Sequence, residues 1–314
     1  MKTSNLIKII LLPLVTVVIA SCEKAFFDEE ENSTANENNG TKKSDGKIEV
    51  TFRISEFNIV PFEQTKQAES NTNLSRQTRS VVDLFSYCSR LNYVVYKDGK
   101  KIDARSQMKG DANFGQVTMK LDAGTYKFLV LAHSSSGNPT LSDPENIKFT
   151  NNDMYSDTFS YYGDFTVNED NTTCEVRLKR NVSCVRFKVN DEFPADVKYM
   201  QFEYTGGSGV LNAVTGYGGN VDSRQIKTVD VSTFSTPLTF NLYTFLQTEE
   251  ATLKLIVQGL ASDRKTIVFE RTFNDVQMKH CCVTEYVGSL FAKDYKISFT
   301  AETDWGEPYY HFDY

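Results

Sequence analysis

The sequence is poor in basic charge and in long apolar runs. Lys and Arg number 34 against 41 Asp and Glu, which gives a formal net charge of −7 over 314 residues. Nucleic-acid sites need a basic face, so this balance argues against DNA or RNA as a partner. The apolar run at residues 9–20 has roughly 12 residues, where a bilayer span needs roughly 20. No later stretch is long and apolar enough to cross a membrane.

The chain also lacks the motifs of common catalytic sites. Neither the Walker pattern nor a dinucleotide-type glycine fingerprint occurs. Residues 206–209 (GGSG) resemble a nucleophile elbow, but that pattern needs Gly where Val210 stands. His133 precedes a Ser/Gly stretch that could hold a nucleophile, although the simpler interpretation is a strand that ends in a loop. No pair of carboxylates stands out for glycoside chemistry. We therefore predict that the protein is not an enzyme and has no cofactor.

The amino terminus has the pattern of a secretory signal that ends in a cysteine. Lys2 and Lys8 form a positive segment before the apolar run, and small residues stand directly before Cys22. This resembles the bacterial lipobox, in which the cysteine thiol receives a diacylglycerol and cleavage occurs just before it. We predict lipid attachment at Cys22; the alternative is an ordinary signal peptide with an incidental cysteine. Several acyl chains on one residue would hold the protein stably on a membrane.

A polar segment follows Cys22. Residues 23–46 are mostly Asn, Glu, Ser, Thr and Lys, with an acidic run at 28–31, and are too polar to fold. We expect a solvated tether with a mean span of roughly 25 to 30 Å. Acidic residues close behind a lipidated cysteine also resemble the surface-export signal of Bacteroidales lipoproteins. A plain acidic linker is the alternative.

The remaining cysteines give little support for disulfides or a metal. Their number is odd, and the chain is too long to need a disulfide framework. The run 280–282 (HCC) contains zinc-ligand types, but neighbouring side chains on a strand point to opposite faces, and the chain has only three histidines. We predict no metal site and expect most of these cysteines to be small core residues. They are Cys88, Cys174, Cys184, Cys281 and Cys282.

Period-two alternation of apolar residues predicts an all-β protein. Aromatic residues make up 12% of the chain and suit pleated, half-buried surfaces. Ile48, Val50, Phe52 and Ile54 fall on one face of a first strand. Short strands separated by turn signals indicate antiparallel sandwiches or barrels. Further strands are expected around residues 117–121, 126–130, 185–189, 200–204, 238–242, 253–257, 267–271 and 295–299.

Turn and helix signals complete the local pattern. Asp98 and Gly99 lie between two strand-like segments and favour a type I′ hairpin. Residues 122–124 link the strand that ends at 121 with the strand that begins at 125. Only residues 81–88 have a helical period, which predicts a short helix. The polar loop before it carries Arg76 and Arg79, and we predict that this loop is sensitive to proteases.

The alternation changes phase midway along the chain. Val176 and Leu178 occupy even positions, whereas Val185 occupies an odd one, so one face cannot stay buried across residues 180–183. We place a domain boundary there. The predicted organisation is a signal peptide (1–21), a tether (22–46), an N-terminal sandwich (47–181), a C-terminal sandwich (182–301) and an aromatic tail (302–314).

Exposed aromatics could also bind a glycan. Such a site needs aromatic faces in a cleft, and the candidates are Tyr161, Tyr162 and the aromatic tail. Tyr161 and Tyr162 must face opposite sides of a strand, so one of them is expected in the core. Five aromatics among the last ten residues either pack on their own domain or form an interaction segment.

Several segments resemble the FimB-type family of fimbrial anchor and minor fimbrillin lipoproteins from the Bacteroidales. The long segment at 202–218 (FEYTGGSGVLNAVTGYG) is the most specific. The other segments are 91–99 (LNYVVYKDG), 121–135 (LDAGTYKFLVLAHSS), 157–167 (DTFSYYGDFTV) and 176–189 (VRLKRNVSCVRFKV).

The resemblance implies two tandem transthyretin-like β-sandwich domains and a lipid-held position on the outer membrane. It also implies that the protein is the base or a minor subunit of an adhesive fimbrium, with fimbrial subunits as partners and no small-molecule ligand. Shaft subunits of the family lose their first strand when a protease cuts after an Arg, and a neighbour's strand fills the groove. A cut at Arg76 or Arg79 would also discard the lipid at Cys22, so an anchor must stay uncut. The alternatives are a processed shaft or tip subunit and a glycan-binding surface lipoprotein.

Overall fold

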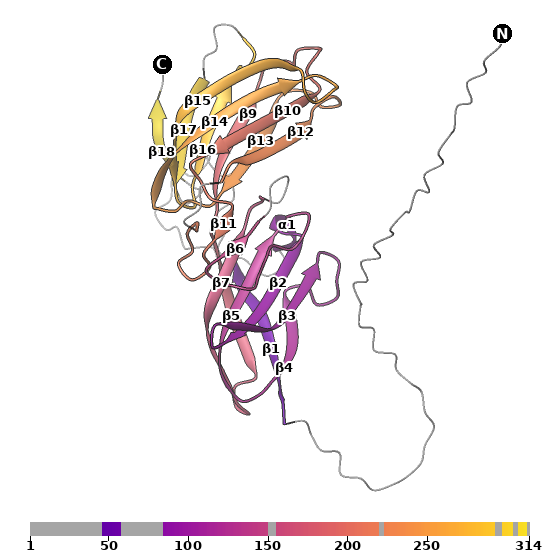
Figure 1. Ribbon diagram of the computed structural model, residues 1–314, viewed down its shortest axis with the longest axis vertical. Coiled ribbons are helices and arrows are strands. Elements are labelled where there is room, and N and C mark those ends of the chain that lie inside the picture. Colours follow the sequence, from indigo (N-terminus) through magenta and orange to yellow (C-terminus); the bar gives the residue numbers. More distant parts are fainter. Residues whose placement is uncertain are drawn as a thin grey trace, which may run out of the picture. The chain divides into compact units, whose positions relative to one another are not determined.

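The computed structural model describes residues 46–57, 84–149, 155–219, 223–292, 297–303 and 307–312 (Figure 1). Regular structure in these ranges is almost entirely β, with one helix of a single turn, α1 (Leu84–Tyr87). The all-β prediction is confirmed, and α1 lies within the predicted helix at 81–88, of which residues 81–83 lie outside the described residues. No helix within the described ranges is long and apolar enough to cross a membrane. Cys22, Arg76 and Arg79 lie outside the described residues.

A seven-stranded sheet forms the first half of the described chain. Its order is β3-β2-β5-β7-β8-β1-β4. β7 and β8 pair only at Phe159–Arg180 and Ser160–Lys179, so the sheet divides there into two parts. Buried side chains from both parts form one core cluster. The strands are β1 (Ile48–Phe57), β2 (Arg90–Lys97), β3 (Lys100–Met108), β4 (Gln116–Leu121), β5 (Gly124–His133), β7 (Phe159–Val167) and β8 (Thr173–Arg180).

Strand β1 is enclosed on both edges. It pairs antiparallel with β4 and parallel with β8. Val50, Phe52 and Ile54 are buried, as the alternation predicted, and the Phe52 ring stacks on Phe128 with 3.8 Å between centroids. The parallel pairing departs from the expected antiparallel pattern. Single-strand periodicity reports which face is buried and carries no information on the direction of the neighbouring strand.

Two further sheets enclose a second core cluster. Their orders are β12-β10-β14-β15 and β13-β9-β16-β17-β18. β9 and β16 form the second parallel pair. The strands are β9 (Ser183–Val189), β10 (Tyr199–Thr205), β12 (Gln225–Asp230), β13 (Leu238–Thr244), β14 (Glu250–Leu260), β15 (Ile267–Lys279), β16 (Val283–Gly288), β17 (Ile297–Thr303) and β18 (Glu307–Phe312).

A small third cluster joins segments from both halves of the sequence. The two-residue strands β6 (Ile147–Lys148) and β11 (Val210–Leu211) pair antiparallel. Val182, which lies between β8 and β9, packs in this cluster with side chains of β2 and β5 and with Phe245. The phase change near 180–183 is thus where the chain leaves the first core cluster, passes through the third and enters the second. The domain boundary at 181/182 stays a prediction.

Of the two predicted turns, the one at residues 98–99 forms a hairpin and the one at residues 122–124 does not. Asp98 and Gly99 have φ of 51° and 73°, and they join β2 to β3, which confirms the hairpin. Residues 122–124 connect β4 to β5, but these strands lie in different parts of the sheet and do not pair with each other. At the carboxy terminus, much of the predicted tail is strand, because β18 pairs antiparallel with β17. Of the strand expected at 295–299, residues 297–299 belong to β17, and residues 295 and 296 lie outside the described residues.

Candidate functional site

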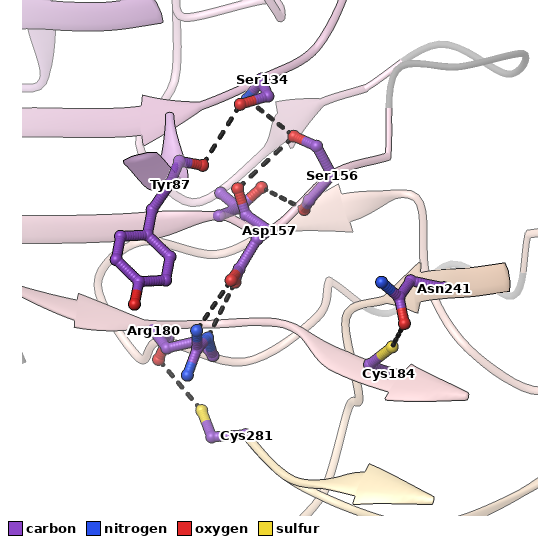
Figure 2. A network of polar contacts seen from close by, with 9 residues as sticks. Tyr87, Ser134, Ser156, Asp157, Arg180, Cys184, Asn241 and Cys281 are labelled. Carbon is purple, nitrogen blue, oxygen red and sulfur yellow. Dashed lines mark hydrogen bonds and ion pairs between the residues drawn. The ribbon is translucent and has the colours of Figure 1, made fainter. Parts of the chain in front are cut away.

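A buried ion pair lies where β7 and β8 meet (Figure 2). Arg180 donates from Nε to Asp157 Oδ1 at 2.8 Å and from Nη2 to Asp157 Oδ2 at 2.7 Å. The two side chains are 4% and 10% exposed. The guanidinium also lies 4.7 Å from the Phe159 ring centroid. Two parallel charge-assisted hydrogen bonds hold both groups in one geometry.

Hydrogen bonds extend from this pair in two directions (Figure 2). On one side, Ser134 N–H donates to Ser156 Oγ at 2.8 Å, next to Asp157. On the other side, the Cys281 thiol donates to the backbone oxygen of Arg180 at 3.0 Å. The network therefore ties the end of β5, the start of β7, the end of β8 and the β15–β16 turn together. Its charged groups are satisfied within the chain, which indicates a structural role.

Both ring nitrogens of His133 also form hydrogen bonds within the chain. Its Nδ1 accepts from Ser135 N–H at 3.2 Å, so Nε2 carries the proton and donates to Asn92 Oδ1 at 2.8 Å. Asn92 in turn donates to Ser106 Oγ and Asn138 Oδ1. Burial, with a smaller contribution from Arg90, lowers the pKa of His133 to about 4. Both ring nitrogens are occupied, which agrees with the strand-end interpretation of this segment.

The five cysteines of the described chain form no disulfide. Burial raises the thiol pKa of Cys88, Cys184 and Cys281 to about 12 and that of Cys174 to about 11. These thiols stay protonated at neutral pH and resemble core residues more than ligands or nucleophiles. Within the described ranges, no group of three or more His, Cys, Asp or Glu side chains is placed to hold a metal ion.

Tyr161 and Tyr162 behave as their positions on one strand predict. Tyr161 packs against the first core cluster and Tyr162 against the third, so they face opposite sides of β7. Neither ring is fully buried. Sequence reasoning identified these tyrosines but not the cavity beside them.

The structure contains two sizeable cavities in its described part. The first, here the β7–β8 cavity, has a volume of about 400 Å³ and is lined by residues 160–162 of β7, Glu175, Arg177 and Lys179 of β8, Asn181, and the loop 213–216. The second, here the Tyr217 cavity, has a volume of about 580 Å³ and is lined by Asp143, Glu145, Asn146, Val210, Asn212, Thr215, Tyr217, Gly218, Gly219 and Gln247.

Strand edges offer a different kind of site. The outer strands of the three large sheets are β3 and β4, β12 and β15, and β13 and β18. An outer strand presents backbone N–H and C=O groups that can pair with a strand from another chain. β18 belongs to this group and lies at the carboxy-terminal end of the described chain.

Comparison with protein families identifies the chain. The model of a family described as "Fimbrillin-A associated anchor proteins Mfa1 and Mfa2" matches residues 83–310, which is most of the sequence. The chain belongs to this family of fimbrial anchor proteins. The resemblance seen in the sequence is thereby confirmed, and membership of this family supports a fimbrial role. A search of curated protein sequences returned no match.

Solved structures give more distant likenesses. One is a candidate polysaccharide-binding protein from Bacteroides thetaiotaomicron, with 11% identity, a TM-score of 0.48, and coverage of 84% of this chain and 98% of that one. A fimbrial assembly protein from Parabacteroides distasonis shares 11% identity with a TM-score of 0.40, over 82% and 96% of the two chains. A candidate adhesin from Bacteroides ovatus shares 12% identity with a TM-score of 0.44, over 82% and 94%.

Proposed function

We propose that the protein is an outer-membrane lipoprotein that forms the base, or a minor subunit, of a fimbrium and supports adhesion. The family match over residues 83–310 carries the fimbrial part of the proposal. The lipobox ending at Cys22 supports attachment through acyl chains. In this role the protein needs no catalysis and no cofactor, and its partners are other fimbrial subunits.

The position of β1 suits an anchor that stays uncut. β1 is the first described strand after the tether, and it contributes three fully buried side chains to the first core. Arg76 and Arg79 follow it in sequence, before α1. A cut at either Arg would break the covalent link between the acylated segment and the head, so that only the packing of β1 would hold the two pieces together. An intact chain keeps the lipid joined covalently to the head.

The amino-terminal sequence and mass of the native protein test this proposal. We expect an acylated start at Cys22, and Cys22→Ala protein should leave the envelope fraction. A start at Gln77 or Ser80 would instead identify a processed polymer subunit. The anchor proposal fails if Cys22→Ala protein still fractionates with the envelope and still supports normally rooted filaments.

We propose further that the junction with a neighbouring subunit forms by β-strand addition at the carboxy-terminal hairpin. β17 pairs with both β16 and β18, whereas β18 is the outermost strand of its sheet. Its outward backbone groups can accept a strand from the next subunit, in the manner of peptides that extend a sheet. The identity of the partner's strand determines whether it pairs parallel or antiparallel with β18.

Deletion of residues 304–314 tests the junction. We expect it to abolish subunit association in a pull-down assay while the unfolding midpoint of the remaining head changes little. Proline scanning at Tyr310 and His311 provides a matched pair, because these residues pair in regular register with Ala301 and Thr300, and successive backbone N–H groups of a strand point to opposite edges. One proline should weaken pairing with β17 and the other should block the free edge. Unchanged association in all three variants would exclude this hairpin as the junction.

A further inference from the structure

Strand β3 is an exposed outer strand of the seven-stranded sheet. It pairs with β2 along its length, and no other strand of the described chain pairs along its second edge. Ile102 and Met108 on this strand are 48% and 50% exposed. A long outer strand with exposed apolar side chains is a ready template for a strand from another chain. We therefore asked how the backbone groups on this edge are satisfied.

The outward backbone groups of β3 belong to alternate residues. Lys109 N–H donates to the backbone oxygen of Ser89 at 2.8 Å, so the backbone of Lys109 points toward the β2 side. Successive residues of a strand direct their backbone groups to opposite edges. The N–H and C=O groups of Ala104, Ser106 and Met108 therefore point away from β2. These are the groups that a docking strand would have to bind.

Asp103 and Arg105 cap both outward groups of Ala104. Ala104 N–H donates to Asp103 Oδ1 at 2.7 Å, and Arg105 Nη1 donates to the Ala104 oxygen at 2.9 Å. The two side chains also form an ion pair with each other. The carboxylate thus takes the place of a neighbouring strand's C=O group, and the guanidinium takes the place of its N–H group. A strand that docks at Ala104 must first break these bonds.

Asp111 caps Met108 in the same way. Met108 N–H donates to Asp111 Oδ2 at 2.8 Å, and Asp111 N–H donates to the Met108 oxygen at 2.9 Å. We call the three residues Asp103, Arg105 and Asp111 the edge clasp. The clasp covers the outward backbone groups on either side of Ser106, so the middle of the β3 edge is closed by the chain itself.

A second copy of the chain is the partner that an uncapped β3 would fit. Two β3 strands can pair antiparallel about a two-fold axis at Ser106, in the isologous manner of symmetric dimers. That register needs the same backbone groups that the edge clasp covers. It also places no like charges opposite each other, which would be unfavourable across two strands. The opposed pairs are Ala104–Met108, Arg105–Gln107 and Asp103–Lys109.

Other outer strands carry single caps of a similar kind. Gln107 Nε2 donates to the backbone oxygen of Gln116, at the start of β4, at 2.7 Å. Lys227 Nζ, from β12, donates to the backbone oxygen of Asn241 on β13 at 2.9 Å. Side chains thus satisfy backbone acceptors on these strands too. On β3 the edge clasp satisfies donors as well as acceptors, which is the fuller form of this protection.

We propose that the edge clasp closes β3 to other chains, so that a second copy of the protein does not pair there. The inference builds on the proposed fimbrial role, in which a neighbouring subunit adds a strand at β18. A subunit with several open edges would take strands at each of them. The clasp removes β3 from this competition and leaves strand addition to other edges of the fold.

Removal of the clasp tests this proposal by analytical ultracentrifugation. The protein is the chain from residue 22 onward with Cys22→Ala, which cannot associate through acyl chains. We expect this protein to sediment with the mass of one chain. Asp103→Ala combined with Arg105→Ala should shift the mass toward two chains as the concentration rises, with a dimer dissociation constant at least about tenfold lower. Addition of Asp111→Ala should lower that constant further.

Two further variants locate the contact. Ala104→Pro removes an N–H group that points away from β2, so in the uncapped protein it should keep the fold and restore the mass of one chain. Lys127→Ala combined with Asp164→Ala is the matched control, because it removes an exposed ion pair from β5 and β7, which are inner strands of the same sheet. This control should leave the mass unchanged.

The proposal is overturned if the uncapped protein keeps the mass of one chain, if Ala104→Pro does not restore that mass, or if the control associates equally. It is also overturned if the capped protein is already a dimer that Ala104→Pro dissociates. Arg105→Ala alone, which uncaps only the Ala104 oxygen, gives the same test with a weaker shift if the double variant fails to fold. These measurements use no fimbrial partner, so their failure would leave the anchor proposal standing.

Discussion

Arg180 holds Asp157 through two parallel hydrogen bonds of 2.8 and 2.7 Å, in a site that is almost closed to solvent. Removing one partner leaves the other charge buried without compensation. We expect Asp157→Ala to lower the free energy of unfolding by about 3–5 kcal/mol in urea denaturation. The double variant Asp157→Ala with Arg180→Met should recover most of that loss, because no unpaired charge then remains.

An exposed ion pair provides the control for this prediction. Lys127 and Asp164 pair at 2.7 Å, but their side chains are 48% and 64% exposed. Asp164→Ala should leave the urea midpoint close to that of the wild type, since solvent and salt screen such pairs. Equal destabilisation by Asp157→Ala and Asp164→Ala would show that the buried network has no special role in stability.

Strand β1 should remain bound even after the chain is cut behind it. Six residue pairs join β1 to β4, six join it to β8, and Phe52 stacks on Phe128. Specific cleavage at Arg76 or Arg79 should therefore leave the amino-terminal fragment associated with the head. The two pieces should co-elute in gel filtration and separate only in denaturant. Immediate separation under native conditions would contradict this expectation.

Truncation of Phe52 measures how much the packing of β1 contributes to the stability of the fold. Its side chain is 1% exposed, and truncation to Ala would leave a cavity in the first core. Phe52→Ala should lower the free energy of unfolding by about 3–5 kcal/mol. Arg53→Ala, the exposed neighbour on the same strand, should have little effect. In the cleaved protein, Phe52→Ala should also speed release of the fragment.

The sequence predicted the buried faces well because side-chain alternation is a local property. Val50, Phe52 and Ile54 lie in the core as their spacing required. Which strands pair with each other was harder to predict from the sequence, because the parallel pairing of β1 with β8 joins segments about 120 residues apart. Register and direction over such separations depend on tertiary packing. Hairpin geometry at Asp98 was predictable because a positive φ favours particular residue types.

The candidate sites were predictable only in part. Tyr161 and Tyr162 could be assigned to opposite faces of one strand, whereas the cavity also needs Asn181 and the loop 213–216. Asn181 stands in the segment where the alternation changes phase, and that change was the one local signal of unusual packing. Nothing in the sequence indicated that Asp157 is buried in an ion pair, because a carboxylate at the start of a strand is usually solvated. Its burial follows from Arg180, which lies 23 residues further along the chain.

Thiol reactivity should be low in the folded chain. Burial raises the pKa of Cys88, Cys184 and Cys281 from 9.0 to about 12, which lowers the thiolate fraction about a thousandfold at pH 8. In Cys22→Ala protein, Ellman's reagent should react slowly under native conditions and should titrate five thiols in denaturant. Cys281 is the least buried of the five, and Cys174 has a lower pKa of about 11, so these two thiols should react before the others. Fewer than five thiols in denaturant would indicate a disulfide and contradict the prediction.

His133 should make the head less stable in mild acid. Its pKa is lowered from 6.5 to about 4 by burial, so the folded state resists a proton that the unfolded state accepts. The stabilising contribution is fully present above about pH 6.5 and is lost progressively as the pH falls toward 4, to a total of about 3 kcal/mol. Urea denaturation between pH 4 and pH 7 should show this loss in the wild type and a flatter profile in His133→Gln. Parallel profiles for the two proteins would mean that His133 takes up its proton equally in both states.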